Sequence, residues 1–310
     1  MIERNLVSGL LSRLEVMHKK LPMPLYALVQ WYLPDLEFRY VPYRVMGRRF
    51  LANRHRHYTA LTTRQLRERR RSDTVFLLGC GQSISSIEDR VWEKIAAHDT
   101  LGWNYWIYHP FTPTYYALEY GGGNSSVDKE HVKLIKQRSD DYADTTILIN
   151  SRARRRGMHP RLQPEYFPER ARVGYFLFPK VVTCSETRPF CAADFRESMF
   201  YRGSLNLYLY FARLAGYRRI VLVGCEMNSA VPFYDDLPQA QWMKQIPGYI
   251  LPREEREKQA YDGAYVSKNK HSLLTTIKAI NEFVFKPEGI ELCVFSEKSL
   301  LYPDVPLLQF

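Results

Sequence analysis

Short, mostly apolar runs alternate with helix-length segments from residue 74 onward. Three of these runs are TVFLLG at 74–79, RIVLVG at 219–224 and IELCVF at 290–295. A continuous apolar run of this length, bounded by glycine or polar residues, is typical of a strand that is buried on both faces. Strands of this kind that alternate with helices predict βα units around a parallel sheet.

Further elements follow from the same patterns. We expect strands at 100–104, 114–118 and 145–150, and helices at 84–97, 127–138, 204–215 and 271–285. The sequence therefore predicts an α/β fold with a doubly wound, mostly parallel sheet. The expected parts are a basic N-terminal helical arm (1–73), a nucleotide-binding α/β domain (74–226), a proline-rich lid insertion (227–270) and the C-terminal part of the α/β domain (271–310).

The net charge of +11 is concentrated in the N-terminal arm. The first 73 residues carry 15 Lys and Arg against 6 Asp and Glu, so the remainder of the chain is nearly neutral. Leu6, Leu10, Leu11 and Leu14 recur there at helical spacing. Three roles for the arm stay open: packing on the body or on a second subunit, contact with an anionic membrane, and binding of nucleic acid. No RNA-binding signature motif supports the third.

Composition excludes several classes of protein. A quarter of the residues are charged and 14% are aromatic, which excludes a disordered tail or a collagen-like chain. The 5 Cys form no CxxC pair, which argues against a zinc ribbon or a disulfide framework and for a reducing compartment.

The stretch 21–34 contains three prolines and is too short to span a bilayer, which takes about 20 residues. We expect a cytoplasmic protein, with peripheral contact at the inner membrane as an alternative for the arm.

The first candidate binding segment directly follows the first apolar strand. In a parallel α/β sheet, ligands bind at the carboxyl ends of the strands. Two glycines there allow a tight turn, expose N–H groups and direct a helix N-terminus at an anion, although a plain tight turn is the alternative. Ile84 occupies the third glycine position of the dinucleotide fingerprint, and Asn104 stands where a ribose-binding Asp or Glu would end strand two. The Asn104 amide can donate and accept, which suits a ribose hydroxyl or a base edge, and a plain strand-end Asn is the alternative. The segment consists of Gly79, Cys80, Gly81, Gln82 and Ser83.

Two helix starts and a second strand end supply the remaining candidates. Gly203 and Ser204 open one helix, where Ser is either an N-cap or a ligand contact. His271 opens another, and a helix N-terminus favours the neutral imidazole that a general base needs, although a structural His is the alternative. The later strand ends at Gly224, Cys225 and Glu226, and Tyr234 lies ten residues beyond Gly224. No Asp-x-Asp or HExxH motif occurs, so we expect no metal.

This ordered set resembles the bacterial sialyltransferases of glycosyltransferase family 42. Order and spacing agree from about residue 74 to 303. The matching motifs are a strand leading into Gly-x-Gly-x-Ser (VFLLGCGQS, 75–83), an Asn closing strand two (Asn104), a Ser opening a helix that runs to an Ala-Gly-Tyr turn (Ser204; 215–217), a strand ending in Gly (220–224), and a His-Ser pair opening a helix with Ile-Lys-Ala inside it (271–272; 277–279).

The resemblance implies a GT-A-like variant nucleotide-binding domain and an inverting, metal-independent transferase without a cofactor. Its donor would be a CMP-activated sialic acid or related nonulosonic acid such as Kdo, and its acceptor a hydroxyl of a capsule or lipopolysaccharide-type glycan. His271 would be the general base and Tyr234 would hydrogen-bond the departing phosphate. Asn228 stands where the family has a second tyrosine. Carried over from the family, the residues that hold the CMP would be Gly81, Ser83, Asn104, Ser204 and Gly224. The full set of predicted nucleotide-binding positions is Gly79, Cys80, Gly81, Gln82, Ser83, Asn104, Gly203, Ser204, Gly224, Cys225 and Asn228.

The chain departs from the family at several of these positions, and other functions stay open. Cys80 replaces an Asn that touches the nucleotide, and Gln82 replaces a Pro. One alternative is a pyrophosphokinase-like enzyme on the same fold, which would need Mg²⁺ and an acidic ligand set. Another is a non-catalytic protein that binds a membrane or nucleic acid through its arm.

Overall fold

The computed structural model describes residues 58–60, 63–120, 130, 133–151, 172–176, 188–195, 199, 203–228, 231–245 and 271–309. The chain divides into two units, Met1–Phe50 and Leu51–Phe310. The first unit, with the leucines of the predicted arm, lies outside the described residues, and so does most of the predicted lid. The alternatives for the arm therefore stay predictions.

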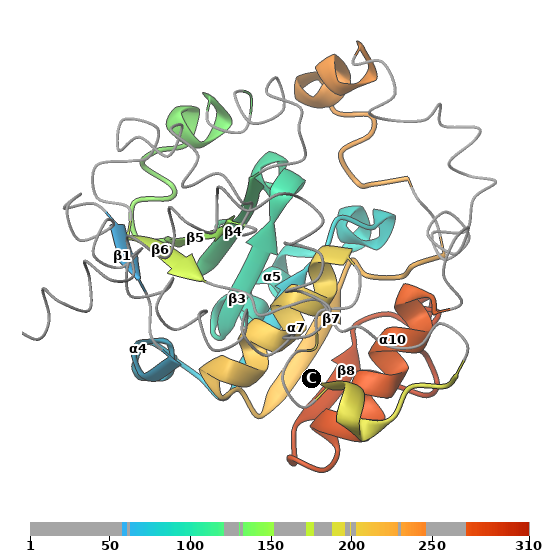
Figure 1. Ribbon diagram of the computed structural model, residues 1–310. Coiled ribbons are helices and arrows are strands. Elements are labelled where there is room, and N and C mark those ends of the chain that lie inside the picture. The colour runs from blue at the N-terminus through green and yellow to red at the C-terminus, as the bar shows by residue number, and fades with distance from the viewer. Residues whose placement is uncertain are drawn as a thin grey trace, which may run out of the picture. The chain divides into compact units, whose positions relative to one another are not determined.

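The described residues form one eight-stranded sheet in which every strand pair is parallel. The predicted doubly wound parallel sheet is confirmed (Figure 1). Its order is β1-β6-β5-β4-β3-β2-β7-β8. The strands are β1 (Tyr58–Ala60), β2 (Thr74–Leu78), β3 (Asp99–Trp103), β4 (Tyr115–Tyr120), β5 (Thr146–Ser151), β6 (Arg172–Phe176), β7 (Arg219–Val223) and β8 (Glu291–Val294).

The strand order reverses between β2 and β7. From β2 the chain proceeds through β3, β4 and β5 to β6 on one side, and β7 and β8 then lie on the other side of β2. β2 pairs with β7 from Thr74↔Arg219 to Leu78↔Val223. In open parallel sheets, ligands bind beyond the carboxyl ends of the strands at such a reversal. The topology therefore predicts a ligand-binding site at the residues that follow β2 and β7.

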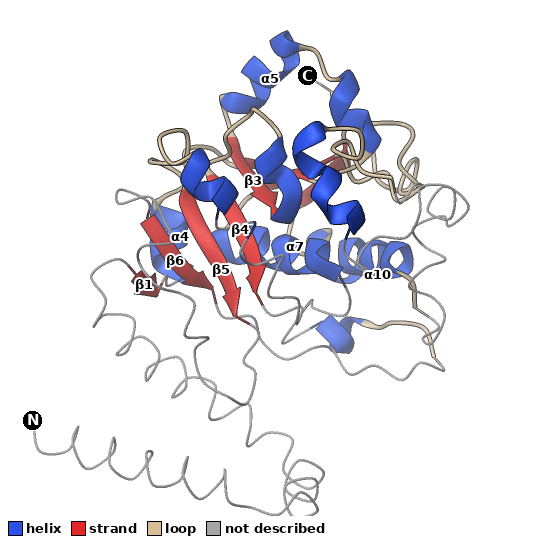
Figure 2. Ribbon diagram, turned by 90° about the horizontal axis from the view of Figure 1, so that it is seen from above, coloured by secondary structure: helices blue, strands red, loops and turns tan. Residues whose placement is uncertain are grey.

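Helices cover both faces of the sheet, as Figure 2 shows from above. Alternation along β2 sends Val75 and Leu77 to one face and Phe76 and Leu78 to the other, and all four are buried. The first face packs against α4 (Thr63–Glu68), α7 (Gly203–Ala215) and α10 (Leu273–Ile280), which continues as a π-helical turn, Asn281–Phe285. The second face packs against α5 (Asp89–Ala96) and the 3₁₀ helix η2 (Asn104–Tyr108).

Two local predictions differ from the structure. The helix expected at 84–97 is instead a short 3₁₀ helix, η1 (Gln82–Ser86), followed by α5. The serines of η1 favour this break, since Ser86 Oγ donates to the backbone carbonyl of Ser83 at 2.8 Å and serine competes for backbone partners in helices. The second difference is that β1 and α4 fall within the predicted arm, although β1 pairs with β6 and Leu66 of α4 lies in the core.

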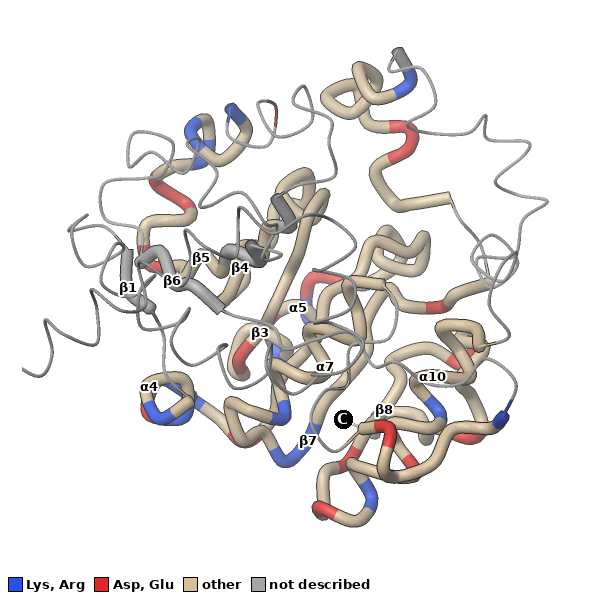
Figure 3. The backbone as a smooth tube through the Cα atoms, viewed as in Figure 1, with Lys and Arg blue, Asp and Glu red and all other residues tan. Residues whose placement is uncertain are grey.

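Arginines at the end of the predicted arm bind the amino edge of the sheet. Blue segments gather around α4 and the start of β7 in Figure 3. Arg71 Nε lies 3.1 Å from Asp99 Oδ1, and the Asp99 side chain is 0% exposed. Arg67 Nε donates to the carbonyl of Leu214 at 3.2 Å. Part of the positive charge in the first 73 residues therefore fixes α4 to the domain. Within the described ranges, no helix is both long and apolar enough to cross a membrane.

Candidate functional site

The turns that follow β2 and β7 are in backbone contact. Gly79 N donates to the carbonyl of Val223 at 2.7 Å, and Gly81 N donates to that of Gly224 at 2.8 Å. Gly224 has φ +65°, and a Cβ there would lie 2.6 Å from Ile84 Cγ1; a Cβ at Gly79 would collide with the carbonyl of Gly224. Because these glycines have no side chains, the turn after β2 and the turn after β7 can approach each other closely. We call residues 79–83 and 224–228 the β2–β7 edge.

The β2–β7 edge differs from the expected anion cradle. The N–H groups of Gly79 and Gly81 were expected to face a ligand, but they donate to β7 and its turn. The first helical element after the turn is the five-residue η1, and α5 begins only at Asp89. An α-helix N-terminus directed at a ligand from this turn was therefore a wrong expectation. The predicted role of Gly79, Cys80, Gly81, Gln82 and Ser83 in nucleotide binding stays a prediction.

Glu226 places a carboxyl group at this edge, just beyond the end of β7, and no sequence pattern predicted a role for it. It is 7% exposed, and it accepts a hydrogen bond from Ser83 Oγ. Its carboxyl lies directly against the α-carbon of Gly81, where any side chain would collide with Oε2. Burial raises the pKa of Glu226, while the Ser83 hydroxyl, backbone N–H groups and the positive charge of Lys298 favour the ionised form.

The two cysteines of the edge are not poised as nucleophiles. Burial raises the pKa of the Cys80 thiol to about 12 and raises that of Cys225 well above its usual range. A thiol of this kind is protonated at neutral pH, and only the thiolate is a strong nucleophile. Cys80 and Cys225 can therefore line a binding site but are poor candidates for covalent chemistry.

An aromatic cluster lies beside the Gly-rich turn. Phe233 N donates to the carbonyl of Cys80 at 2.9 Å, and Gly81 and Pro232 form an antiparallel bridge, so the segment that carries Tyr234 is tied to the turn. Tyr234 is 7% exposed, and its ring lies 5.1 Å from that of Tyr105 between centroids. The structure therefore brings the predicted Tyr234 next to the predicted turn.

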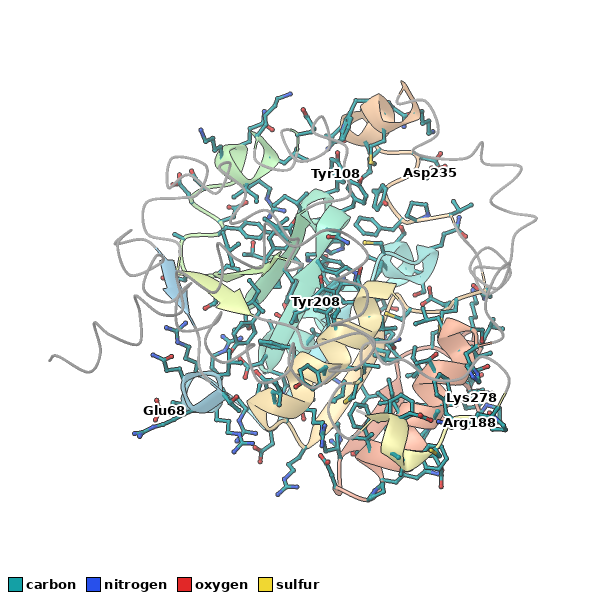
Figure 4. All side chains as sticks on the ribbon, viewed as in Figure 1. Glu68, Tyr108, Arg188, Tyr208, Asp235 and Lys278 are labelled. Carbon is teal, nitrogen blue, oxygen red and sulfur yellow. The ribbon has the colours of Figure 1, made fainter. Side chains whose placement is uncertain are left out.

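The 3₁₀ helix η2 supplies further phenols that sequence reasoning missed. The ring of Tyr108 lies 5.6 Å from that of Tyr234, and the Trp242 Nε1–H donates to the Tyr108 hydroxyl at 2.6 Å. Burial raises the pKa of Tyr108 to about 12. Tyr108 and Asp235 lie toward the same end of the molecule and Glu68 toward the other, as Figure 4 shows. The aromatic run NYWIY after strand two was the available signal.

Asn104 and Asn228 are held by backbone interactions. Asn104 begins η2 with φ +50°, and its carbonyl accepts a hydrogen bond from the Tyr116 hydroxyl. Asn228 is exposed, and its Nδ2 donates to the carbonyl of Lys298 at 3.0 Å, next to β8. Asn228 is therefore directed at the segment that follows β8, and its contact with a nucleotide stays a prediction.

The predicted base lies at the head of α10. His271 is 6% exposed and stacks on Phe190, with ring centroids 4.0 Å apart. The next residue, Ser272, caps the helix and accepts a hydrogen bond from Thr275 N at 3.0 Å. The predicted His-Ser helix start is thus confirmed.

The head of α7 lies beside that of α10. Gly203 has φ +70°, and a Cβ there would lie 3.6 Å from Leu273 Cδ1; Ser204 follows it in the first turn. Because α7 and α10 lead directly into β7 and β8, their heads lie toward the carboxyl ends of the strands. His271 and Tyr234 belong to different packed groups: Phe190, on which His271 stacks, is in the α7/α10 core, and Tyr234 is in the aromatic cluster.

A pocket of about 660 Å³ lies beyond the aromatic cluster, between η2, the 133–138 region and the 233–239 segment. His109 at its wall stacks on Trp106, with centroids 4.5 Å apart, and burial together with Arg138 lowers the pKa of His109 to about 4. Arg138 donates to the carbonyls of Ile107 and Pro110 at 3.0 and 2.8 Å, so its guanidinium stabilises the wall of the pocket.

In the parts of the chain that the structure describes, no group of three or more His, Cys, Asp or Glu is placed to hold a metal ion.

Comparison with known proteins gives a structural likeness alone. No protein-family model matches the sequence, and no curated protein matches it. Among solved structures, the chain is similar to the monofunctional alpha-2,3-sialyltransferase Cst-I from Campylobacter jejuni. The TM-score is 0.44 and the sequence identity is 14%, over 76% of this chain and 80% of that chain. A likeness at this level concerns the arrangement of helices and strands and says nothing by itself about activity.

Proposed function

We propose that this chain is a glycosyltransferase that moves a sialic acid or related nonulosonic acid, such as Kdo, from its CMP donor to a hydroxyl of a bacterial surface glycan. The observation that carries the proposal is the β2–β7 edge. At the reversal of strand order, the turn after β2 contacts both the end of β7 and the Tyr234 segment, and the heads of α7 and α10 lie at the same end of the sheet. The ordered motifs shared with glycosyltransferase family 42 select this function among those that such a site can host.

The chemistry would be a single displacement with inversion. The bond from the acceptor oxygen to the anomeric carbon forms while the bond from that carbon to the CMP phosphate breaks, through an oxocarbenium-like state. Negative charge then grows on the departing phosphate, and fixed donors such as the Tyr234 hydroxyl stabilise it without a metal. His271 removes the proton from the acceptor hydroxyl. The stacking of His271 on Phe190 fixes the plane of the imidazole ring for this task.

A pyrophosphokinase-like enzyme is the second candidate, and metal dependence separates the two. Such an enzyme would need Mg²⁺ and an acidic ligand set, whereas the proposed transferase works with EDTA present. The decisive experiment follows release of CMP from CMP-Neu5Ac, CMP-Kdo and related donors by the full chain, with and without EDTA. Strict dependence on a divalent ion, or failure to bind any CMP-sugar, would overturn the proposal.

Point variants then test the base. We expect His271→Ala to lower the rate of CMP release about 10²- to 10⁴-fold, as is typical for loss of a general base. The matched control is His98→Ala, because His98 lies just before β3 at the amino edge of the sheet, opposite the proposed site. Equal rates for His271→Ala and His98→Ala would remove His271 from the mechanism.

A further inference from the structure

We infer that the carboxylate of Glu226 binds a ribose hydroxyl of the nucleotide, and that the Gly79–Ser83 turn holds this carboxylate in place of a phosphate. The inference deepens the proposed function, since it rests on a nucleotide at the β2–β7 edge. It changes the role expected for the turn, which becomes the support of a hydroxyl-binding carboxylate.

The Gly79–Ser83 turn is already occupied by groups of the chain itself. The N–H groups of Gly79 and Gly81 donate to the backbone of Val223 and Gly224. The Ser83 hydroxyl donates to Glu226, whose carboxyl fills the space over Gly81 that a side chain would take. The five-residue η1 offers no long helix dipole to an anion. A phosphate would meet few remaining donors here, and it would meet the negative charge of a carboxylate.

A carboxylate at this place can accept hydrogen bonds from hydroxyl groups of a ligand. A carboxylate has about four acceptor sites, and the Ser83 hydroxyl and the backbone N–H groups of Ser83 and Glu226 use part of them. The remaining capacity suits a hydroxyl donor, such as the 2′-hydroxyl of a ribose. Glu226 itself is 7% exposed, and it lies beneath a turn whose residues Gly81 and Ser83 are half-buried and whose Gln82 is exposed.

The position of Glu226 relative to the strands also favours contact with a ribose. In nucleotide-binding sheets of this class, an Asp or Glu at the end of the second strand of the βαβ unit binds the ribose. The corresponding strand here is β3, which is followed by Asn104, so an uncharged amide stands in place of the ribose-binding carboxylate. Glu226 follows β7, which lies on the other side of β2. The carboxylate therefore approaches the same region from the opposite side of the strand-order reversal.

The rim of the site supplies a cation that would suit the phosphate. Lys298 is exposed, its positive charge acts on Glu226, and its carbonyl accepts from Asn228. A nucleotide whose ribose lies on Glu226 would direct its phosphate toward such a charge. Loss of Lys298 should then weaken ribo- and deoxyribonucleotides equally, whereas loss of the Glu226 carboxylate should weaken only the former.

The test measures ribose selectivity by calorimetric titration of the full chain with CMP, UMP, AMP and GMP, each paired with its 2′-deoxy form. One hydrogen bond to a charged group corresponds to about 10- to 100-fold in affinity, so the wild type should prefer the ribonucleotide by that factor. In Glu226→Gln the ratio should fall toward one, with no loss of affinity for the deoxynucleotide. In the control Lys298→Gln both affinities should fall and the ratio should stay. Glu226→Asp, which keeps the charge on a shorter side chain, should give an intermediate ratio, and circular dichroism checks that each variant is folded.

The outcomes separate this inference from the proposed function. Ribose selectivity that depends on Glu226 without any turnover of CMP-sugars supports the inference and overturns the transferase. Turnover of CMP-sugars with a ribose preference that Glu226→Gln leaves unchanged overturns the inference and keeps the transferase. A wild type that binds none of the eight nucleotides overturns both.

Discussion

Replacement of Gly224 by alanine tests the close approach of β2 and β7 directly. Gly224 and Gly289 have nearly the same backbone conformation, with φ +65° and +67°. Their surroundings differ, because a Cβ at Gly224 would lie 2.6 Å from Ile84 Cγ1 and 3.0 Å from the carbonyl oxygen of Gly79, whereas a Cβ at Gly289 has nothing within 4 Å. Gly289→Ala is therefore the matched control for the conformational part of the effect.

The expected cost can be worked out from these contacts. A left-handed conformation costs a residue with a Cβ roughly 1–2 kcal/mol, and this applies to both variants. Overpacking of a close-packed interior adds about 1–3 kcal/mol, and this applies only to Gly224→Ala. We thus expect the free energy of unfolding to fall by about 1–2 kcal/mol in Gly289→Ala and by about 2–5 kcal/mol in Gly224→Ala.

Thermal and urea unfolding, followed by circular dichroism, measure the difference. In a domain of this size each kcal/mol lowers Tm by about 2–4 °C. Ile84→Ala should relieve part of the collision, so the double variant with Gly224→Ala should be about 1 kcal/mol more stable than the sum of the single effects implies. Equal destabilisation by Gly224→Ala and Gly289→Ala, together with additivity in the double variant, would refute the contact between the two turns.

Two further predictions concern buried ionisable groups. Arg71→Ala removes the guanidinium from the fully buried Asp99 carboxylate, which keeps its hydrogen bonds from the backbone N–H groups of Arg71 and Ser72, so the variant should lose about 1–3 kcal/mol in urea unfolding. Arg64→Ala, whose partner Glu68 is exposed, should change stability by less than about 1 kcal/mol; similar effects of the two would contradict the role of Arg71. The pKa of His109 is lowered from 6.5 to about 4, so the unfolded chain binds more protons at this site than the folded one. The stability that neutral His109 contributes is complete above pH 6.5 and is lost as the pH falls through about 4, so Tm should fall less steeply with acid in His109→Phe than in the wild type; parallel curves of Tm against pH would show that His109 has no such role.

The order of helices and strands in the core was largely predictable. β2, β7 and β8 lie where their apolar runs placed them, because a strand buried on both faces needs a local composition that is visible in any window of the sequence. The cap of α10 by Ser272 is local in the same sense. Strand β1 lies before the predicted boundary at residue 73, although it belongs to the sheet. The sequence did not reveal it, because β1 is only three residues long and is stabilised by pairing with β6, more than a hundred residues away in the sequence.

The candidate site was predictable in its parts and unpredictable in its contacts. The sequence placed Gly79–Ser83, Gly224 and Tyr234 at strand ends or near them, and topology rules alone suggested that strand ends share one edge of the sheet. The pairing of β2 with β7 decided the contacts. It determines which backbone carbonyls accept hydrogen bonds from the glycine N–H groups, and it brings Ser83 to Glu226, 143 positions away in the sequence. A local pattern can specify a strand, a turn or a cap because its partners lie within a few residues. The burial of Glu226 and its hydrogen bond to Ser83 were decided by the tertiary structure alone, because a segment distant in the sequence sets both.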